Sequence, residues 1–167
     1  HSLDTEGRDR LSLTFPQLQE TLINRLAKLN KHTPVVLING SPLEIGGWLP
    51  NVVSLTEAWY PGMEGGTAVA NILFGKTNPS GRMPFTWPKK LEDAPSYKFG
   101  YQDNDNVLYT EGLKVGYRYF DTAQVEPEFT FGYGLSYTTF DYRNLHLRKT
   151  GATIVSGSVE VHNTGSR

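Results

Sequence analysis

The stretch TPVVLI, residues 33–38, decides the fold class, because a proline is followed there by four consecutive aliphatic residues. Such a run predicts a short, fully buried strand of the kind found in parallel sheets. Upstream, Pro16 stands where a helix would begin, and Pro34 ends the same segment. The leucines between the two prolines are spaced as one side of a helix, with Ile23 beside them: Leu18, Leu22, Leu26 and Leu29.

The same alternation of elements continues downstream. A second aliphatic run, VVSL at residues 52–55, follows a connector that contains proline. Residues 62–75 then combine glycines with apolar residues at helical spacing, which predicts a helix that ends at Gly75. The order helix, strand, strand, helix predicts an α/β layer with a parallel sheet.

The pattern changes in the second half of the chain. Residues 78–88, NPSGRMPFTWP, predict an extended segment that its prolines keep out of a central strand. Residues 89–106 show little periodicity and predict a long polar loop. After Gly134 apolar and polar residues alternate in two stretches, which predicts a β-hairpin or the beginning of a β-sandwich. Because two strands cannot bury a sandwich core alone, we expect the chain to be a fragment of a longer protein.

Composition narrows the functional classes. The 167 residues include 16 Lys and Arg against 17 Asp and Glu, so the formal charge is −1. This balance argues against nucleic acid or an anionic membrane as a partner. The chain has no cysteine, which excludes disulfides and thiolate metal sites but does not settle the compartment.

Two further patterns argue against metals and cofactors. The histidines at 1, 32, 146 and 162 have no metal-ligand spacing, so we interpret them as surface residues. The stretch PGMEGGTAVANILFG, residues 61–75, has glycines before a helix, as phosphate-binding loops do. It lacks the lysine of a P-loop and the G-x-G-x-x-G spacing, so helix capping and close packing explain it better. We therefore expect no metal and no cofactor.

Large aromatic residues stand beside proline or glycine, which is typical of loops: Trp48, Trp59, Tyr60 and Trp87. Aromatic rings at such positions can stack on sugar rings, although they more often belong to a core or an interface. On their own, these aromatic residues do not show whether the chain binds a sugar. The later aromatics, in GYRYF at 116–120, are expected to join a loop to the β region.

The charged stretch DTEGRDR, residues 4–10, is the candidate for catalysis. Gly7 lets the backbone turn sharply after Glu6, and Asp9 lies between two arginines, which favours an ionised structural ion pair. Hydrolysis of a glycoside needs a proton donor on one side of the bond and a second carboxylate on the other. Glu6 could be the donor, although from these residues alone a solvated charged loop is the simpler interpretation.

Several motifs together resemble one family, the second half of a family 3 glycoside hydrolase of the β-glucosidase and β-xylosidase group. The resemblance runs from about Leu3 to the end of the chain, and the closing stretch VEVHNTG is similar to the first strands of a fibronectin type III-like domain. Six motifs carry it in family order: EGRDR, LINGSPLEI, EAWYPGMEGGTAVANILFG, NPSGRMPFTWP, YTEGLKVGYRYFD and FGYGLSYTTF.

The resemblance implies part of an α/β sandwich with a mostly parallel sheet over residues 1–136. The first strands of an immunoglobulin/fibronectin III-like β-sandwich would follow over residues 137–167. It also implies that Glu6, which matches the glutamate of the family motif E-G-x-D-R, is the acid/base of a retaining hydrolase. The accompanying pair Asp9 and Arg10 would hold the shape of that loop.

The nucleophile of this family is an aspartate in an S/T-D-W motif on a TIM-like barrel, and no such motif occurs in the chain. We therefore expect the barrel of the same protein as a partner, and the isolated chain to be inactive. The complete protein would act on β-linked gluco-oligosaccharides or β-glucosides, and a homodimer is possible. The alternative is a non-catalytic carbohydrate-binding or scaffolding module that keeps the fold.

Overall fold

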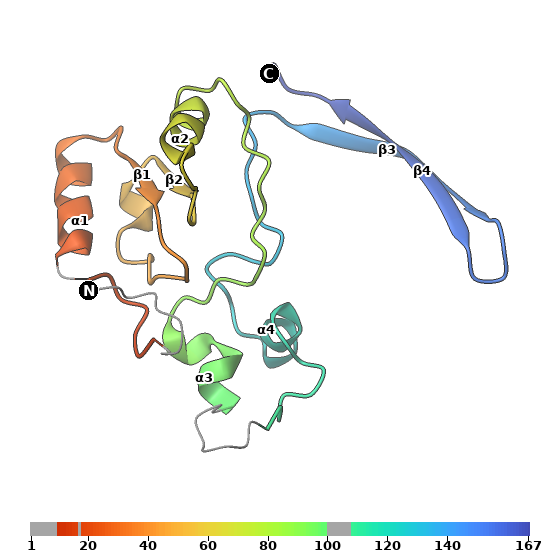
Figure 1. The fold of residues 1–167 in the computed structure, drawn as a ribbon, viewed down its shortest axis with the longest axis horizontal. Helices are drawn as coiled ribbons and strands as arrows, with labels where there is room; N and C mark the ends of the chain where they lie inside the picture. The colour runs from red at the N-terminus through yellow and green to blue at the C-terminus, as the bar shows by residue number, and fades with distance from the viewer. Residues whose placement is uncertain (1–9, 17, 100–107) are drawn as a thin grey trace. The chain divides into compact units, whose positions relative to one another are not determined.

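The computed structural model describes residues 10–16, 18–99 and 108–167. The chain divides into two compact units. The first contains the described residues up to Val69 together with 82–133, and the second contains 70–81 and 134–167. Figure 1 shows the elements of both. No helix among the described residues is long and apolar enough to cross a membrane.

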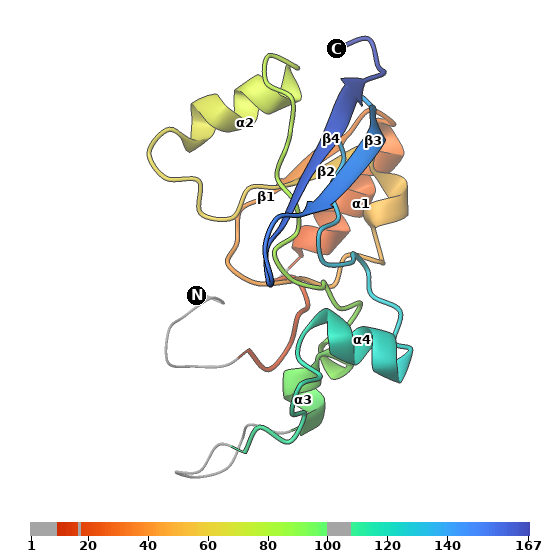
Figure 2. The ribbon, with the colours of Figure 1, turned by 90° about the vertical axis from the view of Figure 1, so that its right-hand side faces the viewer.

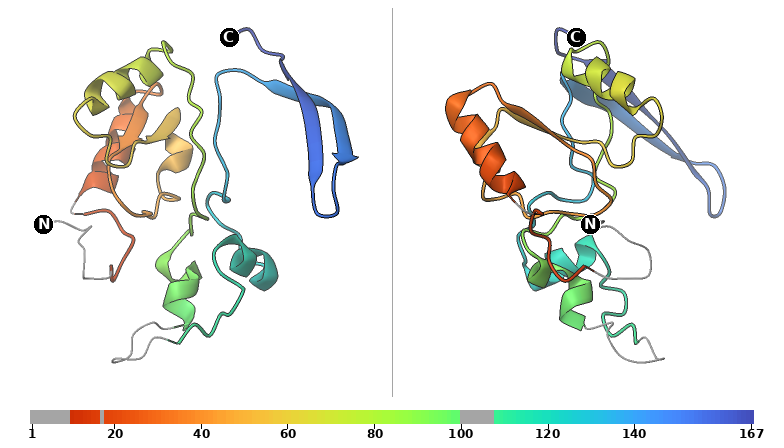
Figure 3. Two further views of the ribbon diagram at one scale, coloured as in Figure 1. Left: turned by 45° about the vertical axis from the view of Figure 1, so that its right-hand side comes forward. Right: turned by 60° about the vertical axis from the view of Figure 1, so that its left-hand side comes forward.

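The first unit contains the predicted helix and both predicted strands. Helix α1 spans Gln19–Leu29, strand β1 spans Pro34–Leu37 and strand β2 spans Ser54–Glu57. The strands pair in parallel, with Leu37 opposite Glu57. Figures 1 and 3 show the two strands next to each other. The predicted α/β layer with a parallel sheet is confirmed.

The second strand begins later than the aliphatic run predicts. A 3₁₀ turn, η1 (Leu49–Asn51), precedes it, and the N–H of Val52 closes this turn by donating to the carbonyl of Leu49 at 3.3 Å. The N–H of Val53 donates to the carbonyl of Thr33 at 3.1 Å. The first two residues of the run are therefore used to enter the sheet, and the strand proper extends to Glu57.

Helix α1 contacts the described core along a narrow side. Ala27 is buried and Ile23 packs against the core cluster. The leucine stripe is exposed, with Leu22 at 56% and Leu29 at 84%. The periodicity thus predicts the helix correctly, while the described residues leave its leucines uncovered.

The core of the first unit is aromatic at its centre. Trp48 and Trp87 are almost completely buried with Leu37, Leu43 and Ile45. The indole Nε1 of Trp87 donates to the carbonyl of Leu43 at 2.9 Å, which satisfies a polar group that is costly to bury alone.

The segment of residues 82–88 is extended, as predicted. It runs beside residues 128–133, and the N–H of Met83 donates to the carbonyl of Tyr133 while the N–H of Trp87 donates to that of Phe129, both at 2.8 Å. Trp87 and Phe129 form an isolated antiparallel bridge. This segment therefore reaches the core without joining the parallel sheet.

The prediction of a long polar loop over residues 89–106 is wrong. The segment 89–106 contains a 3₁₀ turn, η2 (Leu91–Asp93), and a helix, α3 (Pro95–Phe99); its residues 100–106 lie outside the described residues. The aromatic stretch at 116–120, which we expected to join a loop to the β region, lies largely in helix α4 (Tyr117–Ala123). Both helices have at most two turns, too few for a 3.6-residue period to show in the sequence.

Helix α2 spans Gly65–Leu73 and ends as predicted at Gly75. Gly75 has φ +68, a conformation that favours glycine, and its N–H donates to the carbonyl of Ile72 at 2.9 Å. The second unit then continues into an antiparallel hairpin of β3 (Phe140–Lys149) and β4 (Val155–Asn163), seen in Figure 2.

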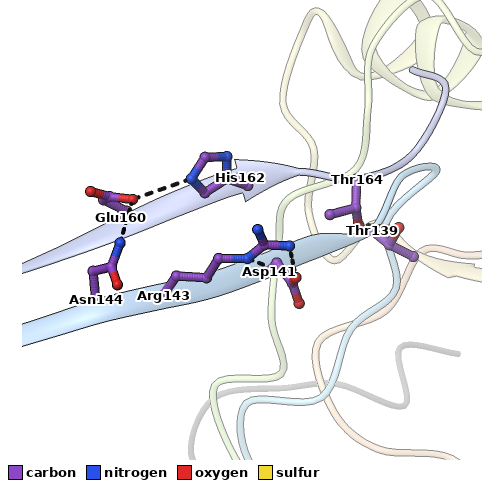
Figure 4. Close-up of polar contacts among 7 residues, drawn as sticks. All are labelled: Thr139, Asp141, Arg143, Asn144, Glu160, His162 and Thr164. Carbon is purple, nitrogen blue, oxygen red and sulfur yellow. Dashed lines mark hydrogen bonds and ion pairs between the residues drawn. The ribbon is translucent and has the colours of Figure 1, made fainter.

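The hairpin is confirmed, and its two faces differ in chemistry. Paired residues share a face, so Asp141 with His162 and Arg143 with Glu160 make one face polar. Figure 4 shows the ion pair of Arg143 with Asp141 at 2.6 Å and the contact of Glu160 with His162 at 3.4 Å. The opposite face carries exposed apolar residues: Phe140, Tyr142, Leu147, Val155 and Val161.

Candidate functional site at the carboxyl edge

The carboxyl ends of β1 and β2 meet at one edge of the parallel sheet, the edge where α/β folds commonly bind ligands. The loop after β1 brings polar residues to this edge, and the loop after β2 brings aromatic ones. We call this set the carboxyl edge: Arg10, Asn39, Gly40, Ser41, Trp59 and Tyr60.

Arg10 ties the beginning of the described chain to the carboxyl edge. Its half-buried guanidinium donates from Nη1 to the hydroxyl of Ser41 at 2.7 Å and to the carbonyl of Pro42 at 3.4 Å. Its Nε donates to the carbonyl of Ser12 at 3.1 Å. The planar guanidinium thus connects two segments, which a lysine ammonium could not do with the same geometry.

The loop that receives Arg10 is itself held in shape. The side-chain amide of Asn39 donates to the carbonyl of Ser41 at 2.7 Å, a local turn that asparagine favours. Further along, the N–H of Glu44 donates to the carbonyl of Leu13 at 2.8 Å. These bonds fix Ser41 where Arg10 reaches it.

Gly40 allows the two loops of the carboxyl edge to touch. A Cβ at this position would lie 2.7 Å from Cζ and 2.8 Å from Cε2 of Tyr60, closer than such atoms approach. The Tyr60 ring therefore lies directly against the backbone of the loop after β1. Gly40 has no positive φ, so its glycine allows this close approach of the Tyr60 ring, and a larger residue would make the ring move.

Trp59 holds the loop after β2 in an unusual conformation. Its φ is +49, which is rare for a bulky residue and costs on the order of 1–3 kcal/mol. Its N–H donates to Oε1 of Glu57 at 2.8 Å, and its ring packs edge-on against Phe85 at 5.5 Å. These contacts stabilise the strained backbone and direct the next residue, Tyr60, outward.

The structure describes some of the residues that the sequence analysis singled out and not others. Glu6 and Asp9 lie outside the described residues, so the acid/base assignment stays a prediction. Of the loop aromatics, Trp48 and Trp87 are core residues, Trp59 is half-buried and Tyr60 is 68% exposed.

The carboxyl edge shows contacts that the sequence analysis missed. Ser41 receives Arg10, and Gly40 lies beneath Tyr60. The signal for both was present, because Gly40 and Ser41 lie two and three residues after the aliphatic run of residues 35–38, where the carboxyl end of a parallel strand is expected.

Neither the shifted pKa values nor the arrangement of acidic and histidine side chains indicates another functional site in the described part of the chain. Lys89 and Glu126 form an exposed ion pair at 2.6 Å; the hydrogen bond between them raises the pKa of Lys89 and lowers the pKa of Glu126. Among the described residues no group of three acidic or histidine side chains is placed to hold a metal ion.

Comparison with known proteins identifies the family. Residues 1–137 match the family model described as the glycosyl hydrolase family 3 C-terminal domain. The chain belongs to this family. It is 44% identical over 165 residues to thermostable beta-glucosidase B of Acetivibrio thermocellus, and 42% identical over 173 residues to beta-glucosidase BoGH3A of Bacteroides ovatus.

Solved family 3 structures share the fold. The beta-glucosidase of Bifidobacterium adolescentis has a TM-score of 0.88 at 39% identity over 96% of this chain and 24% of that chain. DesR, a beta-glucosidase of Streptomyces venezuelae in complex with D-glucose, has a TM-score of 0.86 at 38% identity, covering 97% of this chain and 21% of that one. The chain spans 22% of the Acetivibrio relative and 23% of the Bacteroides relative.

Proposed function

We propose that this family 3 chain is part of a retaining β-glucosidase and supplies its acid/base residue, Glu6. The relatives named above are β-glucosidases, and Glu6 matches the glutamate of the family motif E-G-x-D-R. The observation that carries the proposal is the anchoring of Arg10, the last residue of this motif, to Ser41 at the carboxyl edge. The motif is thereby tied to the edge where ligands bind in α/β folds.

The chemistry divides between two carboxyl groups. Glu6 gives its proton to the glycosidic oxygen as the bond to the leaving group breaks, while a carboxylate on the barrel attacks the anomeric carbon. Glu6, now ionised, then takes a proton from the water that releases the sugar from the enzyme. In a retaining enzyme the two carboxyl groups are about 5–5.5 Å apart.

Arg10 is proposed to help position Glu6 and to take no part in proton transfer. Three residues lie between the two along the chain, so their Cα atoms are four steps apart and at most about 14 Å from each other. The bonds from Arg10 to Ser41 and Pro42 therefore limit how far Glu6 can be from the carboxyl edge.

The test uses the full-length protein with Glu6→Ala. Hydrolysis of cellobiose, whose leaving group needs a proton, should fall by about 10²- to 10⁴-fold. For 2,4-dinitrophenyl β-glucoside, kcat/KM should fall far less, because this leaving group departs without a proton, whereas kcat should fall because release of the sugar from the enzyme still needs Glu6 as the base. Azide should then restore turnover by taking the place of the activated water. An equal loss on both substrates, with no effect of azide, would contradict the assignment.

A non-catalytic carbohydrate-binding module is the second candidate, and the exposed Tyr60 ring is the observation that favours it. The complete open reading frame separates the two candidates. A barrel with an S/T-D-W aspartate upstream of this chain supports the enzyme, and its absence supports the binding module.

A further inference from the structure

A cavity of about 210 Å³ lies beside helix α4 in the first unit. We call it the α4 pocket, and its lining includes Thr86, Tyr117, Phe120, Asp121, Thr130 and Phe131. Sites for drug-sized ligands have volumes of about 300–1,000 Å³. The α4 pocket therefore has room for a smaller molecule.

Thr86 brings a hydroxyl without a partner to the α4 pocket. It lies between Phe85 and Trp87, whose rings stack at 6.1 Å in the core, so the side chain of Thr86 lies on the opposite side of the extended segment. Thr86 is 7% exposed, and its buried hydroxyl has no hydrogen-bond partner among the described residues. Such a group is costly to bury. Rotation about one torsion can turn it toward a ligand without breaking a bond.

The other walls of the α4 pocket combine aromatic rings with a carboxylate. Tyr117 and Phe131 are 43% and 54% exposed, and their ring centroids are 5.5 Å apart. Asp121 lies on the same helix as Tyr117 and is exposed. A sugar ring has both matching features, because its C–H groups pack on aromatic faces and its hydroxyls donate hydrogen bonds to a carboxylate.

Backbone hydrogen bonds hold the walls of the α4 pocket in place. The N–H of Val125 donates to the carbonyl of Phe120 at 3.0 Å, which closes the end of α4. The N–H of Glu128 donates to the carbonyl of Trp87 at 2.9 Å, and the N–H of Trp87 donates to the carbonyl of Phe129 at 2.8 Å. These bonds join two segments that line the pocket, so a ligand can bind with little rearrangement.

We propose that the α4 pocket binds a single sugar ring. The exposed aromatic rings pack against the C–H groups of the sugar, Asp121 accepts hydrogen bonds from its hydroxyls, and Thr86 bonds to a further hydroxyl. Other small ligands use fewer of these groups. A quaternary ammonium ion would contact the rings but leave the hydroxyl of Thr86 unpartnered, and an apolar ligand would make no use of Asp121. The inference goes beyond the proposed function and uses no property of Glu6.

Hydrogen–deuterium exchange in the full-length protein tests the α4 pocket, with D-glucose as the probe. A ligand that binds the folded state slows the exchange of nearby amides, so glucose should protect the peptides that cover residues 117–131. The method reports each peptide separately, so glucose bound elsewhere in the protein does not obscure the result. Sorbitol has similar hydroxyls without the ring. At the same concentration it measures the general effect of such a solute and should protect these peptides far less.

Two variants remove the polar partners of the sugar. Thr86→Val keeps the shape of the side chain and should raise the glucose concentration for half-maximal protection about fivefold. It should not lower the free energy of unfolding measured without glucose, because the hydroxyl has no partner to lose. Asp121→Ala, at an exposed position, should raise that glucose concentration roughly tenfold.

Thr122→Val is the matched control, because it removes a hydroxyl from the same helix that donates to the carbonyl of Arg118 at 2.7 Å. This variant should leave the glucose dependence unchanged. If glucose does not protect residues 117–131, the proposal is wrong. Protection that both Thr86→Val and Asp121→Ala keep at the same glucose concentration would also contradict it, because the sugar would then act from elsewhere. Protection by tetramethylammonium in place of glucose would identify a cation site instead.

Discussion

At the scale of single residues, the carboxyl edge depends on a few side chains with unusual constraints. Arg10, Ser41, Gly40 and Trp59 each have a contact or a backbone angle that other residue types would not reproduce. The family resemblance implied that Arg10, together with Asp9, holds the shape of the charged loop. It did not predict Ser41 or Tyr60 as partners, because contacts between loops depend on the parallel register of β1 and β2.

Arg10→Lys tests the anchor. A lysine keeps the charge but lacks the planar group that reaches both Ser41 and the carbonyl of Ser12, so the anchor at Arg10 should be weakened. We expect kcat/KM for cellobiose in the full-length enzyme to fall on the order of tenfold, since small misplacements of a catalytic group are costly. Ser41→Ala should cost less and should add little on top of Arg10→Lys. Full additivity of the two changes would contradict a shared role.

At the scale of elements, the elements with clear apolar patterns were predicted, and the two short helices α3 and α4 were not. Helix α1, the parallel strands and the β3–β4 hairpin follow from apolar periodicity and from proline and glycine positions. Helices α3 and α4 are stabilised by tertiary contacts, such as the edge-to-face pair of Phe99 and Tyr119 at 5.6 Å. Local sequence carries no sign of such a contact.

A substitution at Trp87 tests how the extended segment of residues 82–88 is attached to the core. Trp87→Phe removes the hydrogen bond from Nε1 to the carbonyl of Leu43 and leaves part of a buried site empty. We expect a loss of about 1–3 kcal/mol in the free energy of unfolding. Denaturant unfolding of the variant and the unchanged protein measures it. Phe131→Leu, at a 54% exposed aromatic residue, serves as the control and should change little. Equal stability of Trp87→Phe and the unchanged protein would show that the bond contributes nothing.

At the scale of the whole molecule, two observations fit a chain that forms one part of a larger protein: its family membership and its exposed apolar surfaces. The described residues leave the leucines of α1 and one face of the hairpin exposed, and the chain covers about a fifth of its relatives' length. The proposed division of roles between Glu6 and a barrel aspartate belongs to this larger scale. The sequence could name Glu6 only through a family motif, because its partner carboxylate does not occur in an S/T-D-W motif of this chain.

The pH dependence of kcat/KM in the full-length enzyme tests the role of Glu6 most directly. A general acid must be protonated in the free enzyme, so activity on cellobiose should fall at high pH as Glu6 loses its proton. Glu6→Gln cannot titrate, so its residual kcat/KM on the same substrate, cellobiose, should show no fall over that range. If the fall at high pH persists unchanged in Glu6→Gln, another group is the acid and the account is wrong.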